Sequence, residues 1–547
     1  MMLHNHLPLW GAAAFLVLCP VLAAAQSPVV DTQAGKLEGQ MEGKLRVFKG
    51  IPFALPPVGE ARWKPPSAMP RWDGVRKATE FGPACYQPTV KIQTVYTRDP
   101  LPMSEDCLTL NIWAPASAHN APVFFWIYGG ALTSGASREG VYDGARLAAR
   151  GVVVVSINYR LGVFGWLAHP ELSAESPKGV SGNYGLLDQI EALRWVRRNI
   201  GAFGGDSANV TIAGESAGAL SVMYLMASPP ARGLFSKAIA ESAYMISTPE
   251  LKQRHYGADA AEVSGTRLAA ALHMPNLAAL RAMDARVLVD AAPAAGYAPW
   301  GTVDGQILPR QLVDVFDRGE QAPVPILTGF NSGEIRSLRA LAPQPVASAA
   351  EYERIIRERY LDLAGEFLRL YPSTNIEESI LATTRDALYG WTSERLVRKQ
   401  AARGVPSYLY FFDHGYPAED AAHLHAFHAS ELPFVFGTFD ATTQNWPKIP
   451  DTPGEKNLSE AMIGYWTSFA RTGKPQAANQ PNWPAFGSAH SYMAFTDAPH
   501  PEERLMPGMY EFNEEVVSRS KARGDIAWNW FVGLASPKLP APKAPEK

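Results

Sequence analysis

The chain lacks a run of basic residues, and its charges nearly balance. Its 547 residues carry 50 Lys and Arg against 53 Asp and Glu, which gives a formal net charge of −3. Nucleic-acid-binding proteins usually present a clustered basic patch or stripe, and polybasic segments are what attract proteins to anionic membranes. The charge pattern therefore predicts neither kind of partner.

Internal repeats and transmembrane helices are also missing, so the sequence predicts no stable membrane insertion. The hydrophobic content of 47% and the charged content of 19% are ordinary for a globular protein. Length alone favours three or four domains of roughly 150 residues each.

The N-terminus has the pattern of a secretory signal. Residues 10–18 are apolar, and Ala23-Ala24-Ala25 resembles a small-residue cleavage site. A membrane anchor is the alternative, but Pro8 and Pro20 leave too short a stretch to span about 30 Å of hydrocarbon. We therefore expect a cleaved signal peptide over residues 1–25 and a secreted or periplasmic protein.

A second alternative is a lipoprotein, and one feature of the N-terminus is also unusual for a signal peptide. A lipoprotein site at Cys19 is disfavoured because bulky Leu18 precedes it. The leading segment carries His4 and His6 but no Lys or Arg, which is weak for a signal peptide.

Cysteine is scarce: beyond Cys19 only Cys85 and Cys107 remain. An even pair in an exported chain favours a disulfide, worth about 3 kcal/mol of loop-closure entropy. Two reduced, buried cysteines are the alternative.

Short β-branched or aromatic runs alternate with helical patterns. The helix expected over residues 186–200 has one apolar stripe. Near-continuous apolar runs are typical of strands buried on both faces of a parallel sheet. The runs lie at residues 123–127, 152–157, 210–213, 237–242, 324–328 and 407–412.

The alternation predicts one large α/β domain over residues 26–534 and not several domains. Residues 248–318 and 340–404 are rich in helix formers, and we expect them to be helical insertions over the C-terminal edge of the sheet. The Pro-, Lys- and Ala-rich tail, residues 535–547, is predicted to be disordered.

The pentapeptide Gly214-Glu215-Ser216-Ala217-Gly218 lies between a predicted strand and a predicted helix. A G-x-S-x-G sequence in that setting is typical of the nucleophile elbow of an α/β-hydrolase. Glycines around the serine allow a close strand–helix crossing and a strained turn. Ser216 is thus the candidate nucleophile.

A serine hydroxyl needs a base, and the base needs an orienting acid. In this fold the acid and then the histidine follow the serine along the chain, and Glu334 and His428 satisfy that order. His423, His425 and His428 could alternatively form a metal cluster, but no cysteine or H-E-x-x-H pattern accompanies them. We expect neither a metal nor an organic cofactor.

The segment Tyr128-Gly129-Gly130-Ala131-Leu132 follows a predicted buried strand. Small residues there allow backbone N–H groups to approach a substrate oxygen and stabilise an oxyanion. A simple turn at the end of a strand is the alternative.

Taken together, these segments resemble the type-B carboxylesterases, which include cholinesterases and bacterial para-nitrobenzyl esterases. The resemblance runs from about Val29 to Phe531. Further matching segments are residues 48–54, 104–113, 158–162, 182–189 and 203–206.

The resemblance implies an α/β-hydrolase fold and a set of roles. Ser216 would be the nucleophile, His428 the base and then the acid, and Glu334 the orienting acid. Backbone N–H groups of Gly130, Ala131 and Ala217 would form the oxyanion hole. It also implies a Cys85–Cys107 disulfide, ion pairs Arg62–Glu105 and Arg160–Asp188, Ser242 behind the acid, and Glu215 at the pocket floor.

Two departures from the family pattern bear on specificity. Ala131 replaces the usual third glycine, so we expect slower or more selective catalysis. The segment between the cysteines contains Tyr96 but no tryptophan to hold a quaternary ammonium by cation–π attraction, which disfavours choline esters.

The sequence therefore predicts a serine carboxylesterase acting on small-molecule esters, with no preference predicted for acyl or alcohol group and no oligomeric state. An esterase for a large natural or polymeric ester and a non-catalytic binding module on the same fold are the alternatives.

Overall fold

The computed structural model describes Met1 and residues 27–541. Residues 2–25 of the expected signal peptide lie outside the described residues. Among those described, no helix has both the length and the apolar character required to cross a membrane.

One eleven-stranded mixed sheet forms the centre of the molecule, in the spatial order β16-β15-β14-β13-β12-β11-β9-β10-β8-β4-β3. Strands β9 to β15 pair in parallel, and the strands at both edges pair antiparallel. The strands are β3 (Gln40–Glu42), β4 (Leu45–Pro52), β8 (Thr109–Pro115), β9 (Ala121–Ile127), β10 (Val153–Ile157), β11 (Gly205–Glu215), β12 (Lys237–Glu241), β13 (Ile326–Asn331), β14 (Ser407–Phe412), β15 (Ser491–Phe495) and β16 (Pro499–Glu503).

The six predicted strand runs are confirmed as β9 to β14, and every residue of β9, β10, β12 and β13 is buried. Burial on both faces explains why these strands read as continuous apolar runs. Two small sheets lie beside the main one: β1 (Val29–Thr32) with β2 (Gly35–Glu38) and β5 (Val75–Lys77), and β6 (Ala84–Cys85) with β7 (Met103–Ser104).

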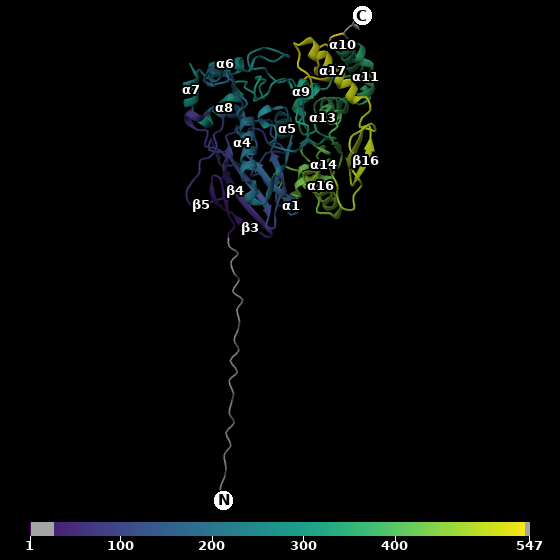
Figure 1. The fold of residues 1–547 in the computed structure, drawn as a ribbon. Helices are drawn as coiled ribbons and strands as arrows, with labels where there is room; N and C mark the ends of the chain where they lie inside the picture. Colours follow the sequence, from purple (N-terminus) through teal and green to yellow (C-terminus); the bar gives the residue numbers. More distant parts are fainter. Residues whose placement is uncertain (2–26, 542–547) are drawn as a thin grey trace.

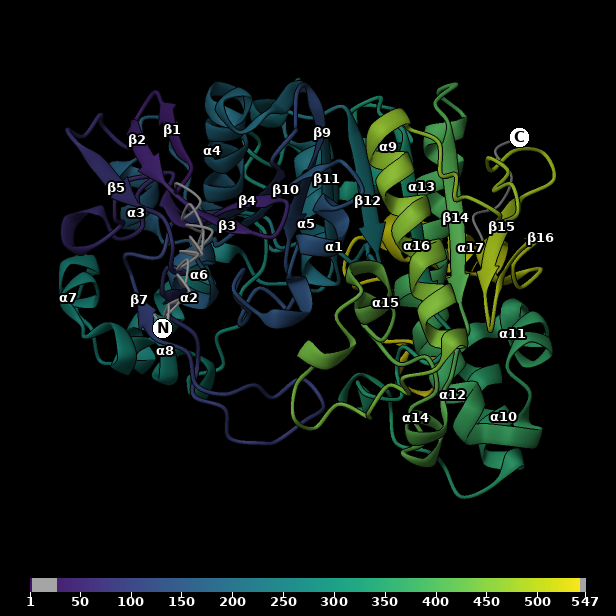
Figure 2. The same ribbon diagram turned by 90° about the horizontal axis from the view of Figure 1, so that it is seen from below.

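Helices flank the sheet, and the long α16 packs along it beside β9 and β11 (Figure 2). The helices are α1 (Ala145–Ala148), α2 (Gly162–Trp166), α3 (Pro170–Glu175), α4 (Tyr184–Asn199), α5 (Ala217–Ala227), α6 (Ala261–Ala271), α7 (Leu277–Ala282), α8 (Ala285–Ala294), α9 (Leu312–Asp317), α10 (Ala349–Tyr360), α11 (Ala364–Leu370), α12 (Ile376–Arg385), α13 (Trp391–Ala401), α14 (Pro417–Ala421), α15 (Leu432–Phe436), α16 (Pro453–Thr472) and α17 (Met509–Arg523).

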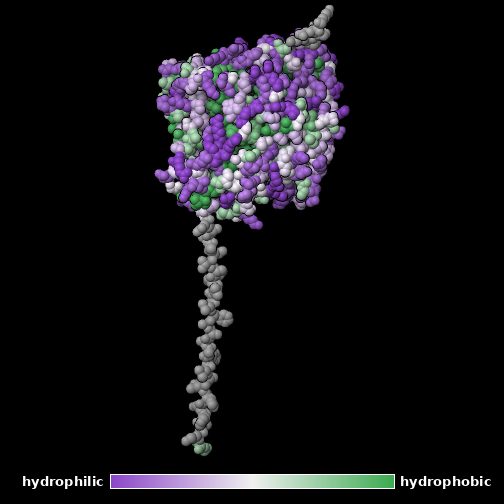
Figure 3. Space-filling view, in the orientation of Figure 1, coloured by the Kyte–Doolittle hydropathy of each residue, from purple (hydrophilic) through white to green (hydrophobic). Residues whose placement is uncertain are grey.

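Both predicted insertions are helical: α6 to α9 fall in the first and α10 to α13 in the second. Helices α6, α7, α8, α10 and α11 gather at one end of the molecule, away from β3 and β5 (Figure 1). The face seen in Figure 3 is mainly hydrophilic, with hydrophobic residues scattered over it.

The prediction of a disordered tail is wrong for residues 535–541. Leu539 is buried in a cluster with Tyr360 and Phe512, and its backbone N–H donates to the Arg359 carbonyl at 2.8 Å. The prediction was made from the Pro- and Lys-rich composition, which gives no indication that one leucine is buried. Residues 542–547 lie outside the described residues.

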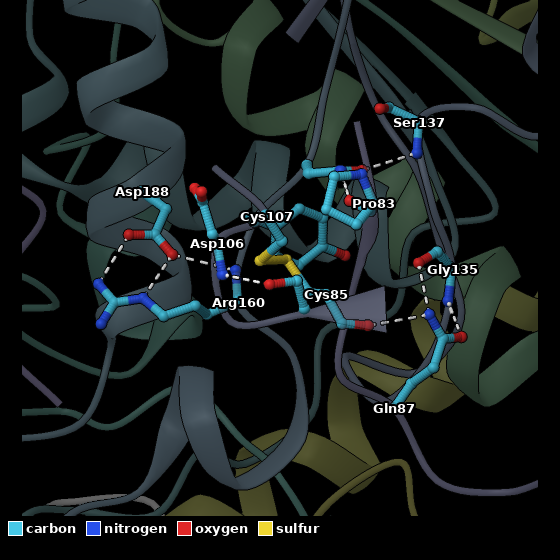
Figure 4. The surroundings of a disulfide bond; sticks show 12 residues. Pro83, Cys85, Gln87, Asp106, Cys107, Gly135, Ser137, Arg160 and Asp188 are labelled. Atoms are coloured by element: carbon cyan, nitrogen blue, oxygen red, sulfur yellow. Dashed lines mark hydrogen bonds and ion pairs between the residues drawn. A yellow bond between two sulfur atoms is a disulfide. The ribbon is translucent and has the colours of Figure 1, made fainter. Parts of the chain in front are cut away.

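Cys85 and Cys107 form the predicted disulfide, and Figure 4 shows it beside the ion pair of Arg160 with Asp188. Both ion pairs implied by the resemblance are present. Arg62 contacts Glu105 at 2.6 Å, and the buried Arg160 contacts Asp188 at 2.7 Å.

Strand β11 turns into helix α5 where three backbone segments nearly touch. A Cβ atom added to Gly218 would lie 2.0 Å from the Ile127 carbonyl oxygen, and one added to Gly214 would lie 2.5 Å from the Gly218 carbonyl carbon. Any side chain at either glycine would push β9, β11 and α5 apart.

We therefore expect Gly218→Ala to lower the free energy of unfolding by about 3 kcal/mol, because backbone cannot move aside as a side chain can. A urea titration measures this. The control is Gly201→Ala, where an added Cβ meets nothing within 4 Å and the change should stay within about 1 kcal/mol. Equal effects of the two substitutions would contradict the close-crossing argument.

Candidate active site

Ser216 occupies the turn between β11 and α5 in a strained conformation, with φ 56° and ψ −120°. Such a conformation costs about 1–3 kcal/mol and persists only where the surroundings enforce it. Here the Ser216 N–H donates to the Glu241 carbonyl on the adjacent strand at 2.9 Å. Ser216 is partly exposed while Glu215 and Ala217 on either side are buried, so the turn presents this one residue to solvent.

The register of the parallel strands assembles the rest of the site. Gly214 pairs with Ile127, Glu215 with Glu241, and Glu241 with Gly329. The carboxyl ends of β9, β11, β12 and β13 therefore meet at one level, and the loops that follow them converge around Ser216.

Glu334 and His428 are brought together, although 94 positions separate them in the chain. The His428 Nδ1 hydrogen-bonds Glu334 Oε2. The other carboxylate oxygen, Oε1, accepts from the Ser242 hydroxyl at 2.6 Å and from the Asn331 N–H at 2.9 Å. Because Glu334 is fully buried and held at both oxygens, it fixes the orientation of the imidazole.

The second imidazole nitrogen faces the elbow. His428 Nε2 lies 3.0 Å from Glu215 Oε1, and Glu215 directly precedes Ser216. Among the hydrogen bonds of residues 27–541, none joins the Ser216 hydroxyl to His428. Hydrogen bonds between a nucleophile and its base are often long or misaligned before substrate binds.

Charge in this site is governed by burial. Burial by itself lowers the pKa of His428, but the nearby carboxylates Glu215 and Glu334 outweigh it and raise the pKa to about 9. Burial raises the pKa of Glu215 to about 7, although His428 acts in the opposite direction. The site thus favours an imidazolium flanked by carboxylates.

Two further buried carboxyls lie beneath the site, and sequence reasoning missed both. Burial raises the pKa of Glu241 to about 8 and that of Glu431 well above its usual range. Glu241 accepts from the Trp466 indole at 2.9 Å, and Glu431 accepts from the Asn331 amide at 2.6 Å. For Glu431, the sequence signal that could have indicated a place near the site is its position three residues after His428.

The glycine loop after β9 packs directly on the elbow. A Cβ atom added to Gly129 would lie 3.1 Å from the Ser216 Cβ. Gly130 and Ala131 have φ angles of 102° and 55°, which turn the chain sharply. Within residues 27–541, no hydrogen bond uses the backbone N–H of Gly130, Ala131 or Ala217, so all three donors are free for a ligand.

Two of the three clustered histidines have different partners. His425 lies between Asp413 and Asp420, at 3.1 Å and 2.7 Å, and His428 lies between Glu334 and Glu215. In the described part of the chain, no group of three or more His, Cys, Asp or Glu side chains has an arrangement that could hold a metal ion.

Comparison with solved structures agrees with this architecture. A solved PNB esterase superimposes with a TM-score of 0.77 at 34% sequence identity, covering 89% of this chain and 99% of that one. The fold is that of an α/β-hydrolase.

Sequence comparison gives the family. The model of the carboxylesterase family matches residues 26–512. Fumonisin B1 esterase from Sphingopyxis macrogoltabida is 36% identical over 495 residues, 87% of this chain and 88% of the relative. Para-nitrobenzyl esterase from Bacillus subtilis is 37% identical over 471 residues, 84% and 92% of the two chains. The chain belongs to the carboxylesterase family and is a carboxylic ester hydrolase.

The electrostatics of His428 predict a pH dependence. An imidazole accepts a proton only in its neutral form, so we expect kcat/KM to rise with pH through the pKa of His428. Glu215→Gln removes a negative charge that stabilises the imidazolium, so the pKa should fall and the acidic limb should move to lower pH by about one unit. The measurement is a pH profile of kcat/KM.

Glu431→Gln is the matched control. Burial raises the pKa of Glu431 well above its usual range, and the ion pairs of His428 among the described residues are with Glu215 and Glu334 and not with Glu431, so this substitution removes no ion-pair partner of the imidazole. If the acidic limb of the Glu215→Gln profile does not move, or moves by the same amount in both variants, Glu215 does not raise the pKa of His428 as argued.

Proposed function

We propose that Ser216 is the nucleophile of this esterase, that His428 is its general base and then its general acid, and that Glu334 orients the imidazole. The observation that carries the proposal is the position of His428, which hydrogen-bonds Glu334 through Nδ1 and directs Nε2 at the residue adjoining Ser216. An imidazole oriented by a buried acid beside the elbow is one part of the arrangement that a serine nucleophile requires, and the hydrogen bond from the Ser216 hydroxyl to Nε2 is the part that the proposal adds.

In the proposed reaction, the Ser216 oxygen attacks the ester carbonyl carbon while His428 Nε2 accepts the hydroxyl proton. The carbonyl π electrons move to oxygen, and the tetrahedral intermediate collapses as the alkoxide leaves with the proton held by His428. Water then attacks the acyl-enzyme, again giving its proton to His428, and the acid departs from the regenerated serine.

The N–H groups of Gly130, Ala131 and Ala217 are the proposed oxyanion donors. Their lack of other partners and the contact of Gly129 with Ser216 support this role. Each such donor is worth about 3–4 kcal/mol of barrier. Ala131 is exposed at its positive φ, so its methyl group stands at the loop surface, where we expect it to limit the acyl groups that fit.

The proposed substrate is a small-molecule carboxylic ester. Relatives carry names for different esters: fumonisin B1, para-nitrobenzyl and, for a human relative 34% identical, cocaine. Specificity thus differs among relatives of similar identity to this chain. The disulfide and the predicted signal peptide support export to an extracellular or periplasmic location.

Ser216→Ala should lower kcat for para-nitrophenyl butyrate by about 10⁴-fold or more, since alanine has no hydroxyl to form the acyl-enzyme. Steady-state kinetics, with circular dichroism to verify folding, provide the measurement. The control is Ser207→Ala, an exposed serine on the same strand, which should keep full activity. A folded Ser216→Ala protein with more than about one hundredth of normal kcat would refute the proposal.

A further inference from the structure

The segment closed by the Cys85–Cys107 disulfide contacts both the glycine loop after β9 and the region that follows His428. Near its start, the Gln87 side chain donates to the Gly135 carbonyl at 3.1 Å and accepts from the Gly135 N–H at 3.0 Å (Figure 4). Gly135 ends the turn that contains Gly130 and Ala131. Near its middle, the Val95 carbonyl accepts from the Thr443 hydroxyl. The segment thus bridges the oxyanion turn and the region that follows His428.

Tyr96, at the middle of this segment, reaches the catalytic histidine itself. Its hydroxyl donates to the His428 carbonyl at 2.8 Å. A phenol has one proton, so the Ser337 hydroxyl, 2.6 Å away, is the donor in the second bond. The Tyr96 ring also packs edge-on to the imidazole, with centroids 6.5 Å apart. One side chain therefore holds both the backbone and the ring of His428.

The backbone at His428 needs such support. Ala426 and Ala429, on either side of it, have φ angles of 46° and 69°, a region that costs an alanine about 1–2 kcal/mol. Strain of this kind persists only where the surrounding contacts determine the backbone from several directions.

Three successive carbonyls supply those contacts. The Ala426 carbonyl accepts from the Gly333 N–H at 3.0 Å, and the Phe427 carbonyl accepts from the Asn331 amide at 2.8 Å. Asn331 ends β13, and Gly333 belongs to the loop after it, which carries Glu334. The third carbonyl, that of His428, accepts from Tyr96. The disulfide-closed segment therefore supplies the hydrogen bond to the His428 carbonyl, which neither β13 nor the loop carrying Glu334 supplies.

We propose that Tyr96 is a positioning residue, which, through its hydrogen bond to the His428 carbonyl, couples the Cys85–Cys107 segment to the proton relay. The inference rests on the proposed role of His428. As a base, His428 is needed for every ester; as an acid, it is needed only for a leaving group that must be protonated. A misplaced imidazole should therefore harm alkyl esters more than nitrophenyl esters.

The test compares ethyl butyrate with para-nitrophenyl butyrate, which share one acyl group. Tyr96→Phe keeps the ring and removes the hydroxyl. We expect kcat/KM to fall about tenfold for the ethyl ester and no more than about threefold for the nitrophenyl ester. The control is Tyr86→Phe, which makes the same change on the same segment at a residue without a contact to His428. It should leave the ratio of the two kcat/KM values unchanged.

A second arm tests the coupling. In the Cys85→Ala/Cys107→Ala protein the same ratio should shift, and adding Tyr96→Phe should shift it no further, because the two changes act on one contact. Equal losses for both esters in Tyr96→Phe, or the same ratio as in Tyr86→Phe, would overturn the inference. The Ser216→Ala result tests the underlying function separately, so the two failures can be told apart.

Discussion

Backbone segments approach one another at the elbow more closely than any side chain permits. Gly214 and Gly218 let β11, α5 and the end of β9 meet, and Gly129 brings the next loop against Ser216. The crossing fixes three things at once: the strained Ser216 conformation, the outward direction of its side chain, and the position of the unpaired N–H groups beside it. The rest of the site is arranged around that point, since the register of β12 and β13 delivers Ser242 and Glu334 to the same level.

The second constraint is electrostatic. Glu215, Glu241, Glu334 and Glu431 are all buried within one small region, where like charges repel strongly and water cannot screen them. Burial is the main cause of the raised pKa values of Glu215, Glu241 and Glu431, and neighbouring carboxylates add to it. The carboxylates Glu215 and Glu334 in turn raise the pKa of His428. The imidazolium that the proposed mechanism forms on His428 would therefore lie among carboxylates that are already in place.

Much of this could be predicted from residues near one another in sequence. The apolar runs of β9 to β14 and the glycines around Ser216 carry local signals that need no tertiary information. Edge strand β16, with Pro499 and Pro501, does not resemble a strand, because proline is tolerated at a sheet edge but breaks the pattern of alternation. The disordered tail was predicted from composition, which cannot register the burial of Leu539.

The electrostatic partners were harder to predict for the same reason. The pairing of Glu241 with Trp466 and the contact of Tyr96 with His428 join residues that are hundreds of positions apart. The placement of Glu334 beside His428 was expected from chain order and family resemblance. Its exact support by Asn331 depends on a backbone turn that no pattern of residue types specifies.

The most direct measurement is a crystal structure of the enzyme after reaction with an alkyl phosphonate, a stable mimic of the tetrahedral intermediate. The account predicts a covalent bond from phosphorus to the Ser216 oxygen. It also predicts a phosphoryl oxygen within hydrogen-bond distance of the N–H groups of Gly130, Ala131 and Ala217, and His428 Nε2 turned from Glu215 toward the Ser216 oxygen. A phosphonate on another residue, or a phosphoryl oxygen directed away from all three N–H groups, would contradict it.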